Sequence, residues 1–197
     1  LKVNPSEEML LIYDMMLDEC AKTIFERRTK AVEQLLPLVE RYYALLSSDR
    51  ERIGMQYRSD LQEGTMADML LASRRKDFIN EHTTIGIHRD DVIFTIAEYP
   101  LRKFGSQGQQ KSFLVALKLA EYTLLAEHNN EKPILLLDDL FDKLDMGRVA
   151  QLLRLVGSEM FGQIFITDCN KHRLQRTLSE AGAEYKLFTI AEGKHHE

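Results

Sequence analysis

The stretch Ile134-Leu135-Leu136-Leu137-Asp138-Asp139 decides the fold class of this chain. Its four consecutive apolar residues fit a β-strand that is buried on both faces, as strands are in parallel sheets. The two carboxylates that follow lie at the carboxyl end of that strand, where open α/β sheets bind ligands. Two interpretations are open. The pair is either a strand end with two acidic loop residues, or a Walker B segment, in which Asp138 holds Mg²⁺ and Asp139 orients or deprotonates the attacking water.

Beyond residue 83 the sequence alternates between strand patterns and helix patterns on both sides of this stretch. Such alternation predicts an α/β fold, with a mostly parallel sheet flanked by helices over residues 83–197. Strands are expected at 84–88, 92–96, 133–137, 163–167 and 185–190, and helices at 109–127, 146–160 and 171–181.

Residues 1–82 have a mainly helical pattern instead. Asn4 is a candidate N-cap, with Pro5 at the first helical position. Apolar residues then recur every three or four positions over 10–45, which predicts one apolar stripe on a helix of about 40 residues. Pro37 lies inside that helix and predicts a kink. A weak strand pattern at 53–59 and a helical pattern at 66–79 complete this part.

Composition excludes several classes of protein. The chain has 197 residues, of which 44% are hydrophobic and 29% charged, as in globular proteins. No apolar run reaches the roughly 18 to 20 residues of a membrane span, and no signal-peptide core is present.

Cys20 and Cys169 form no close pair, so we expect a reducing cytoplasm. The net charge of −5 excludes a chain coated in basic residues, so any contact with DNA must be a local patch.

A second motif, Phe104-Gly105-Ser106-Gln107-Gly108-Gln109-Gln110-Lys111-Ser112, leads into the helix expected from residue 109. Small residues at a helix start expose backbone N–H groups and the positive end of the helix dipole, which suits a phosphate. As a Walker A loop, the motif has Gly105, Lys111 and Ser112 in place. Gln110 stands where the second glycine belongs, and its side chain would obstruct the approach to the phosphates.

The same residues also fit the Leu-Ser-Gly-Gly-Gln signature of ABC-type ATPases. Ser106, Gly108 and Gln109 match it, and Gln107 replaces one glycine. A serine-capped turn before a helix is a third interpretation, favoured if the motif stands alone. It does not stand alone, because the Walker B-like strand starts about 25 residues later and Lys143-Leu144-Asp145 follows, resembling a D-loop.

Three motifs in this order make residues 84–170 resemble the RecF family of DNA replication and repair proteins. The matching residues within 84–170 are Gly86-Ile87-His88-Arg89-Asp90-Asp91, 104–111, Leu117-Lys118-Leu119-Ala120-Glu121, 133–139 and Phe165-Ile166-Thr167. The helical first 80 residues resemble that family's arm subdomain by pattern only.

The resemblance implies an ABC-type ATPase head with a helical arm, in a protein that binds ATP and Mg²⁺ and dimerises around the nucleotide. It also implies binding to gapped, single-stranded and double-stranded DNA, and action with RecO and RecR to place RecA at single-strand gaps. In that scheme the signature, Ser106, Gln107, Gly108 and Gln109, contacts the γ-phosphate held by the opposite subunit. Asp138 is then the magnesium ligand, Asp139 the catalytic base, and Asp145 a contact to the dimer partner.

The family's Walker A loop lies upstream of the signature, and residues 1–83 contain no such loop. The chain therefore resembles the C-terminal half of a RecF protein and is expected to bind ATP weakly or not at all by itself. The complete protein is expected to be a slow, DNA-dependent ATPase. Two rival interpretations remain: a self-contained NTPase with a degenerate loop at 105–112, and a dimerisation module whose acidic pair is inert.

Overall fold

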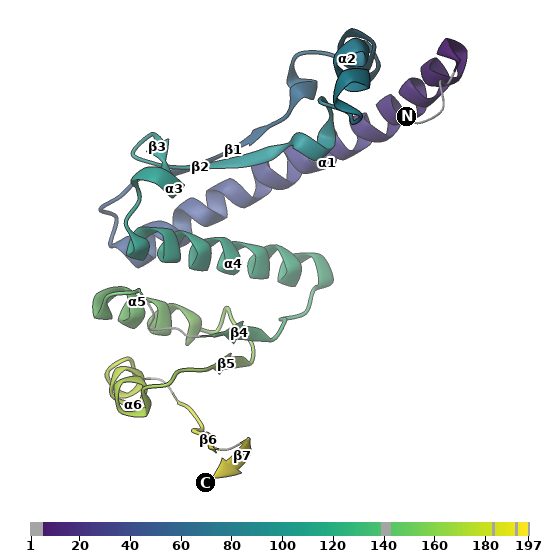
Figure 1. Ribbon diagram of the computed structural model, residues 1–197. Helices are drawn as coiled ribbons and strands as arrows, with labels where there is room; N and C mark the ends of the chain where they lie inside the picture. The colour runs from purple at the N-terminus through teal and green to yellow at the C-terminus, as the bar shows by residue number, and fades with distance from the viewer. Residues whose placement is uncertain (1–5, 139–142, 183, 192, 197) are drawn as a thin grey trace. The chain divides into compact units, whose positions relative to one another are not determined.

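The computed structural model describes residues 6–138, 143–182, 184–191 and 193–196, and it forms two compact units. The first consists of Leu1–Pro37 and Ile53–Phe104, and the second of Leu38–Arg52 and Gly105–Glu197. Figure 1 shows the elements. The helices are α1 (Glu7–Ser47), α2 (Met66–Asn80), α3 (Leu101–Phe104), α4 (Gln107–Asn129), α5 (Met146–Val156) and α6 (Lys171–Glu180), with 3₁₀ turns η1 (Asp60–Gln62) and η2 (Ile87–Arg89). The strands are β1 (Ile53–Arg58), β2 (Asp91–Ile96), β3 (Tyr99–Pro100), β4 (Leu135–Leu137), β5 (Ile164–Ile166), β6 (Thr189–Ala191) and β7 (Lys194–His196).

Helix α1 confirms the long helix expected in the first quarter of the chain. It has 41 residues and continues through Pro37, and the division between the two units falls directly after that proline. The predicted cap at Asn4 and the proline at position 5 lie outside the described residues. At the start of α1, the hydroxyl of Ser6 accepts a hydrogen bond from the backbone N–H of Met9 at 3.3 Å.

The first unit contains an antiparallel sheet in the order β1-β2-β3. Strand β1 pairs with β2 over its whole length, from Ile53 opposite Ile96 to Arg58 opposite Asp91. This pairing keeps residues 83–104 in the same unit as most of the helical part. The compact units thus divide the chain differently from the subdomain boundary expected at residue 82.

The strand expected at 84–88 is wrong. Residues 87–89 form the 3₁₀ turn η2 instead, and Gly86 before it has φ +136°, a conformation that strands of L-residues do not adopt. The side chain of Asp77 also accepts hydrogen bonds from the backbone N–H and the hydroxyl of Thr84, at 2.8 and 2.6 Å. These bonds bind the start of the segment to α2 rather than to a neighbouring strand.

The second unit has the parallel pairing that the sequence predicts. Strand β4 pairs in parallel with β5, with Leu135 opposite Ile164 and Leu137 opposite Ile166. The burial expected on both faces of β4 is not found in the described residues, because Leu135 and Leu137 are buried whereas Leu136 is 71% exposed. The strand expected at 185–190 begins only at Thr189, and it pairs with β7, which the sequence did not predict.

The core of the second unit lies between α4, α5 and the last turns of α1. Tyr42 and Tyr43 of α1 and Leu119 of α4 are fully or nearly fully enclosed, as are Val149 and Leu152 of α5. The Tyr43 ring packs on Phe113 at a centroid distance of 6.3 Å. This packing fixes the first turns of α4 and α5, where the sequence places the signature and the D-loop residue.

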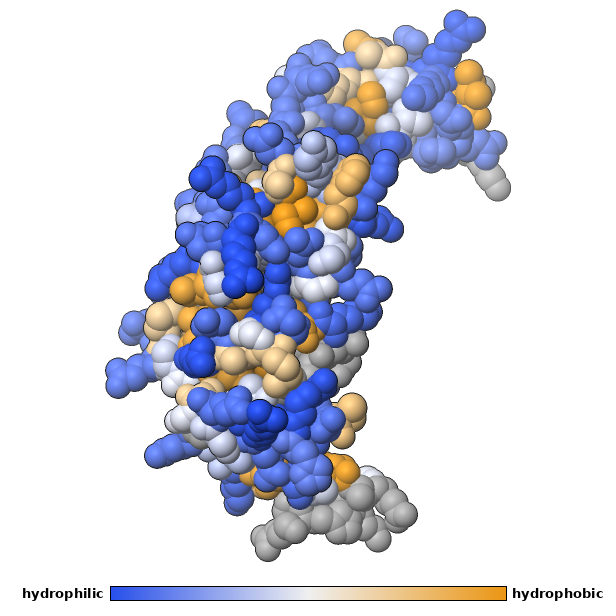
Figure 2. Space-filling model, turned by 90° about the vertical axis from the view of Figure 1, so that its left-hand side faces the viewer, coloured by the Kyte–Doolittle hydropathy of each residue, from blue (hydrophilic) through white to orange (hydrophobic). Residues whose placement is uncertain are grey.

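Hydrophilic side chains predominate on the face drawn in Figure 2, and apolar side chains gather there in separate patches. Over the described ranges, none of the helices combines the length and the apolar character needed to cross a membrane.

Candidate phosphate-binding site

The signature residues form the first turn of α4. Ser106 is the N-cap, and its hydroxyl accepts a hydrogen bond from the backbone N–H of Gln109 at 3.2 Å. In return, the side-chain oxygen of Gln109 accepts from the backbone N–H of Ser106 at 2.7 Å. This reciprocal capping box satisfies two N–H groups and fixes where the helix begins.

The next two backbone N–H groups, from Gln107 and Gly108, have no acceptor among the described residues. N–H groups at a helix start point outward along the axis, and the helix dipole adds positive potential there. The first turn of α4 therefore offers two donors to an anion, with the Ser106 hydroxyl beside them.

Gly108 also lies against the residues that follow the Walker B segment. A Cβ at this position would be 3.1 Å from the backbone oxygen of Lys143, which itself has φ +61°. The Lys143-Leu144-Asp145 segment therefore approaches the signature turn more closely than most side chains allow. Two motifs that are about 35 residues apart in sequence thus form one surface.

Gln110 occupies the place that a Walker A loop reserves for glycine. Its side-chain amide donates a hydrogen bond to the backbone oxygen of Gly105 at 2.8 Å, so it closes the turn before α4. A phosphate-wrapping loop needs open backbone at this place. This geometry favours the signature interpretation over a degenerate Walker A loop.

Asp138 lies at the carboxyl end of β4, and its side chain is exposed. Thr167 follows the parallel strand β5; its backbone N–H donates to the oxygen of Leu137 at 3.0 Å, and its hydroxyl donates to the carboxylate of Asp138. A carboxylate with a neighbouring hydroxyl is the kind of oxygen donor that Mg²⁺ uses together with substrate phosphates. Asp139, the predicted base, lies outside the described residues.

In the described part of the chain, this site offers a metal ion one carboxylate, that of Asp138. No group of three or more His, Cys, Asp or Glu side chains there is arranged to hold a metal ion. Mg²⁺ sites that work on nucleotides commonly have only one or two protein carboxylates, because phosphates and water supply the other ligands. Asp138 therefore fits a metal that arrives with a nucleotide.

Asp145, the predicted D-loop residue, is the N-cap of α5. Its carboxylate accepts from the backbone N–H of Arg148 at 2.9 Å and from the Nε of the same residue at 3.2 Å. The Asp145 side chain is 67% exposed, so it keeps a free edge toward solvent. This exposure suits a residue that touches another subunit.

Arg148 and Glu51 connect these motifs, although neither belongs to a motif that can be recognised in the sequence. The guanidinium of Arg148 donates to the hydroxyl of Ser112 at 2.8 Å and to Oε1 of Glu51 at 2.9 Å. Glu51 also accepts from the side-chain nitrogen of Gln109 at 3.1 Å, and from the hydroxyl of Tyr43. One carboxylate therefore contacts the signature, α5 and α1.

The ionisation of this cluster follows from its contacts. Partial burial alone raises the pKa of Glu51, but the hydrogen bonds from Tyr43 and Gln109 and the charge of Arg148 outweigh it, and the pKa lies below its ordinary value. Burial together with the hydrogen bond to Glu51 raises the pKa of Tyr43. Glu51 is thus an anion and Tyr43 a neutral donor at neutral pH.

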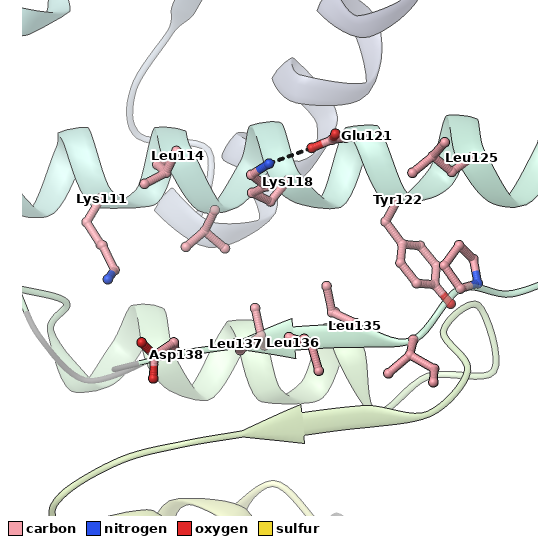
Figure 3. Close-up of a pocket in the computed structure, with 13 residues that line it drawn as sticks. Lys111, Leu114, Lys118, Glu121, Tyr122, Leu125, Leu135, Leu136, Leu137 and Asp138 are labelled. Carbon is pink, nitrogen blue, oxygen red and sulfur yellow. Dashed lines mark hydrogen bonds and ion pairs between the residues drawn. The ribbon is translucent and has the colours of Figure 1, made fainter.

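A groove of about 280 Å³ runs between α4 and β4 (Figure 3). Lys111 and Asp138 lie toward the same end of the groove, and Leu125 toward the other. Apart from Lys118 and Glu121, which pair with each other at 2.7 Å, the remaining lining residues are apolar or aromatic. The lining includes Leu114, Val115, Tyr122, Pro133, Ile134, Leu135, Leu136 and Leu137.

In the first unit, His88 and Arg89 belong to the turn η2, Asp90 follows it, and Asp91 begins β2. Asp90 accepts from the guanidinium of Arg28 at 2.7 Å and from the hydroxyl of Tyr57, and its side chain is 4% exposed. Asp91 lies 3.8 Å from Arg58 on the paired strand. These ion pairs hold the residues between η2 and β2 against α1 and β1 of the same unit.

Curated relatives match nearly the whole chain. The DNA replication and repair protein RecF of Bacteroides thetaiotaomicron is 39% identical over 187 residues, which cover 95% of this chain and 51% of that protein. The RecF proteins of Flavobacterium johnsoniae and Parabacteroides distasonis are each 41% identical over 183 residues. The chain spans about half the length of these relatives, and no protein-family model matches it.

Solved structures agree with the relatives. The recombination mediator protein RecF-ATPrS in the RecFOR pathway superposes with a TM-score of 0.75 at 26% identity, covering 98% of this chain and 52% of that one. The recombination mediator protein RecF-ATP in the RecFOR pathway superposes with a TM-score of 0.70 at 28% identity, covering 85% of this chain. The α/β class and the position of the chain in the C-terminal half of such proteins are thereby confirmed.

Proposed function

Since this chain belongs to the RecF family and matches the C-terminal half of its members, we propose that it carries the signature side of an ATP site shared between two subunits. In this proposal, the first turn of α4 receives the γ-phosphate of a nucleotide held by the opposite subunit. The observation that carries the proposal is the contact between Gly108 and the oxygen of Lys143. It places two free helix-start donors and the D-loop segment on one surface, as a subunit interface around a phosphate requires.

The proposed roles combine the geometry of the described residues with the motifs of the sequence. Ser106 and the N–H groups of Gln107 and Gly108 bind phosphate oxygens, and Gln109 completes the signature. Asp138 holds Mg²⁺, which would supply charge neutralisation at the phosphates. Asp139 is the base for the attacking water, and hydrolysis is slow because an aspartate reaches less far than the glutamate of most ABC-type ATPases.

We also propose the biological setting of the complete protein. It binds gapped, single-stranded and double-stranded DNA as an ATP-dependent homodimer in the cytoplasm, and acts with RecO and RecR to help load RecA. The names of the relatives and the RecFOR pathway of the solved structures support DNA repair and replication as this setting. In the 197 residues of this chain, whose net charge is −5, we expect any DNA contact to be a local surface.

The test is ATP-dependent dimerisation of the full-length protein, measured by analytical ultracentrifugation. Ser106→Arg places a long cation in the signature turn, and we expect it to abolish dimerisation without abolishing ATP binding to the monomer. Ser158→Arg, at an exposed serine after α5, is the matched control and should dimerise as the wild type does. A Ser106→Arg protein that dimerises normally would overturn the proposed function.

A further inference from the structure

We propose that Arg148 and Glu51 are positioning residues that hold the signature and Asp145 in one arrangement, and thereby set the ATP concentration at which the dimer forms. This inference rests on the proposed function, because it concerns the same phosphate-binding surface. Neither residue belongs to the motifs that the sequence singled out. Both lie in the second unit, on segments 97 residues apart.

Arg148 contacts three separate segments with one guanidinium. Its three side-chain nitrogens donate to Asp145, Ser112 and Glu51, at 3.2, 2.8 and 2.9 Å respectively. Ser112 in turn donates to the backbone oxygen of Gly108 at 2.8 Å. The rigid planar fork of an arginine thus fixes the distance between the D-loop residue and the glycine of the signature, which a flexible point charge such as lysine cannot do.

Glu51 decides how the side-chain amide of Gln109 is oriented. The nitrogen of that amide donates to Glu51 at 3.1 Å, and its oxygen accepts from the backbone N–H of Ser106 at 2.7 Å. A flipped amide would bring its oxygen against a carboxylate and its NH₂ against an N–H donor, both of which are repulsive. The charge on Glu51 therefore keeps the capping box closed and the Ser106 hydroxyl aligned with the helix start.

Burial makes these contacts stronger than those of ordinary surface pairs. The side chains of Arg148 and Glu51 are 15% and 21% exposed. Arg176 and Glu180 on α6, by contrast, form an ion pair of 2.8 Å with 79% and 55% exposure. Exposed pairs contribute little because water screens them, whereas removing one member of a shielded pair leaves the other charge without compensation.

The experiment compares Glu51→Gln, Arg148→Lys and the double variant in the full-length protein. Two quantities are measured: ATP affinity of the monomer below the dimerisation concentration, and the ATP concentration for half-maximal dimerisation. We expect each single variant to raise the second quantity about tenfold or more while monomer affinity stays within about twofold. The ATP concentration for half-maximal dimerisation of the double variant should be no higher than that of the more affected single variant, because both changes break the same network.

Arg176→Lys with Glu180→Gln is the matched control, and both quantities should stay at their wild-type values. If Glu51→Gln and Arg148→Lys dimerise at the wild-type ATP concentration while Ser106→Arg does not dimerise, the positioning role is wrong and the proposed function stands. Equal losses of monomer affinity, dimerisation and thermal stability would also overturn it, because they indicate a general structural role. Normal dimerisation of Ser106→Arg would instead overturn the proposed function itself.

Discussion

Gly108 of α4 lies directly against the backbone oxygen of Lys143, so close that a Cβ on Gly108 would be 3.1 Å from that atom. Gly108 lies within the signature and Lys143 begins the D-loop segment. The contact involves backbone on both sides, which cannot move aside as the end of a flexible side chain would. The glycine in the signature therefore serves the fold as well as the phosphate. It lets the D-loop segment reach the helix start from which the two free N–H groups point.

Gly108→Val tests this relationship. The added carbons collide with backbone, so we expect a loss of about 1–3 kcal/mol in the free energy of unfolding and a loss of ATP-dependent dimerisation. Urea unfolding and ultracentrifugation measure the two effects. Gly64→Val is the control, since a Cβ there meets only the flexible end of Met69, at 3.6 Å. If Gly108→Val dimerises as the wild type does, the close approach of the two backbones is not needed for dimerisation.

Asp77 stabilises the first unit through three donors. Its carboxylate accepts from the N–H and hydroxyl of Thr84, and from the hydroxyl of Ser73 at 2.8 Å, and the residue is buried. In Asp77→Asn, one acceptor oxygen is replaced by an NH₂ donor that faces the donors of Thr84 or Ser73. This change should lower the free energy of unfolding by about 1–3 kcal/mol in urea titrations. Glu63→Gln, at an exposed site, should change it by less than about 0.5 kcal/mol.

The same carboxylate gives the first unit a specific acid sensitivity. Burial alone raises the pKa of Asp77, but the hydrogen bonds from Thr84 and Ser73 and the charge of His82 outweigh it, so the folded-state pKa lies below its ordinary value of 3.8. The stabilisation is therefore complete above that value and is lost as the pH falls through the folded-state pKa. Urea titrations from pH 7 to pH 3 should show a smaller loss of stability in Asp77→Asn than in the wild type. If the wild type and Asp77→Asn lose equal stability over this pH range, the Asp77 carboxylate is not the source of the acid sensitivity.

Asp139→Asn separates an ATPase from an inert dimerisation module. Asparagine keeps the size of the side chain but cannot accept a proton, so phosphate release by the full-length protein with DNA should fall roughly 10²- to 10⁴-fold. Dimerisation with ATP should persist, because the signature and Asp138 are unchanged. An unaltered rate of phosphate release would favour the inert module.

Local signals in the sequence were sufficient for most helices and for β4 and β5. Capping residues, apolar periodicity and a run of four apolar residues are properties of neighbouring positions, and they predicted α1, α4 and the parallel pair. The segment 84–88 was missed because its conformation depends on Gly86 and on Asp77, which lies on another element.

The site was predicted only in part, because some of its contacts join residues that are far apart in the sequence. The sequence selected Ser106, Gly108 and Asp145 because their motifs are local. Glu51 follows a polar loop with no distinguishing pattern, and its link to Arg148 spans 97 residues, so only the folded chain brings the two together. Ser112 and Thr167 are ordinary hydroxyl residues by sequence, and their roles depend on the helix and strand beside them.

In the function proposed above, this chain supplies only the signature side of an ATP site. Titration of Mg²⁺-ATP into the chain alone, followed by calorimetry, tests it most directly. We expect no binding up to millimolar ATP, because residues 1–104 contain no Walker A loop and Gln110 closes the turn at 105–112. Micromolar binding that Lys111→Ala abolishes would contradict it, and would make 105–112 a working phosphate loop.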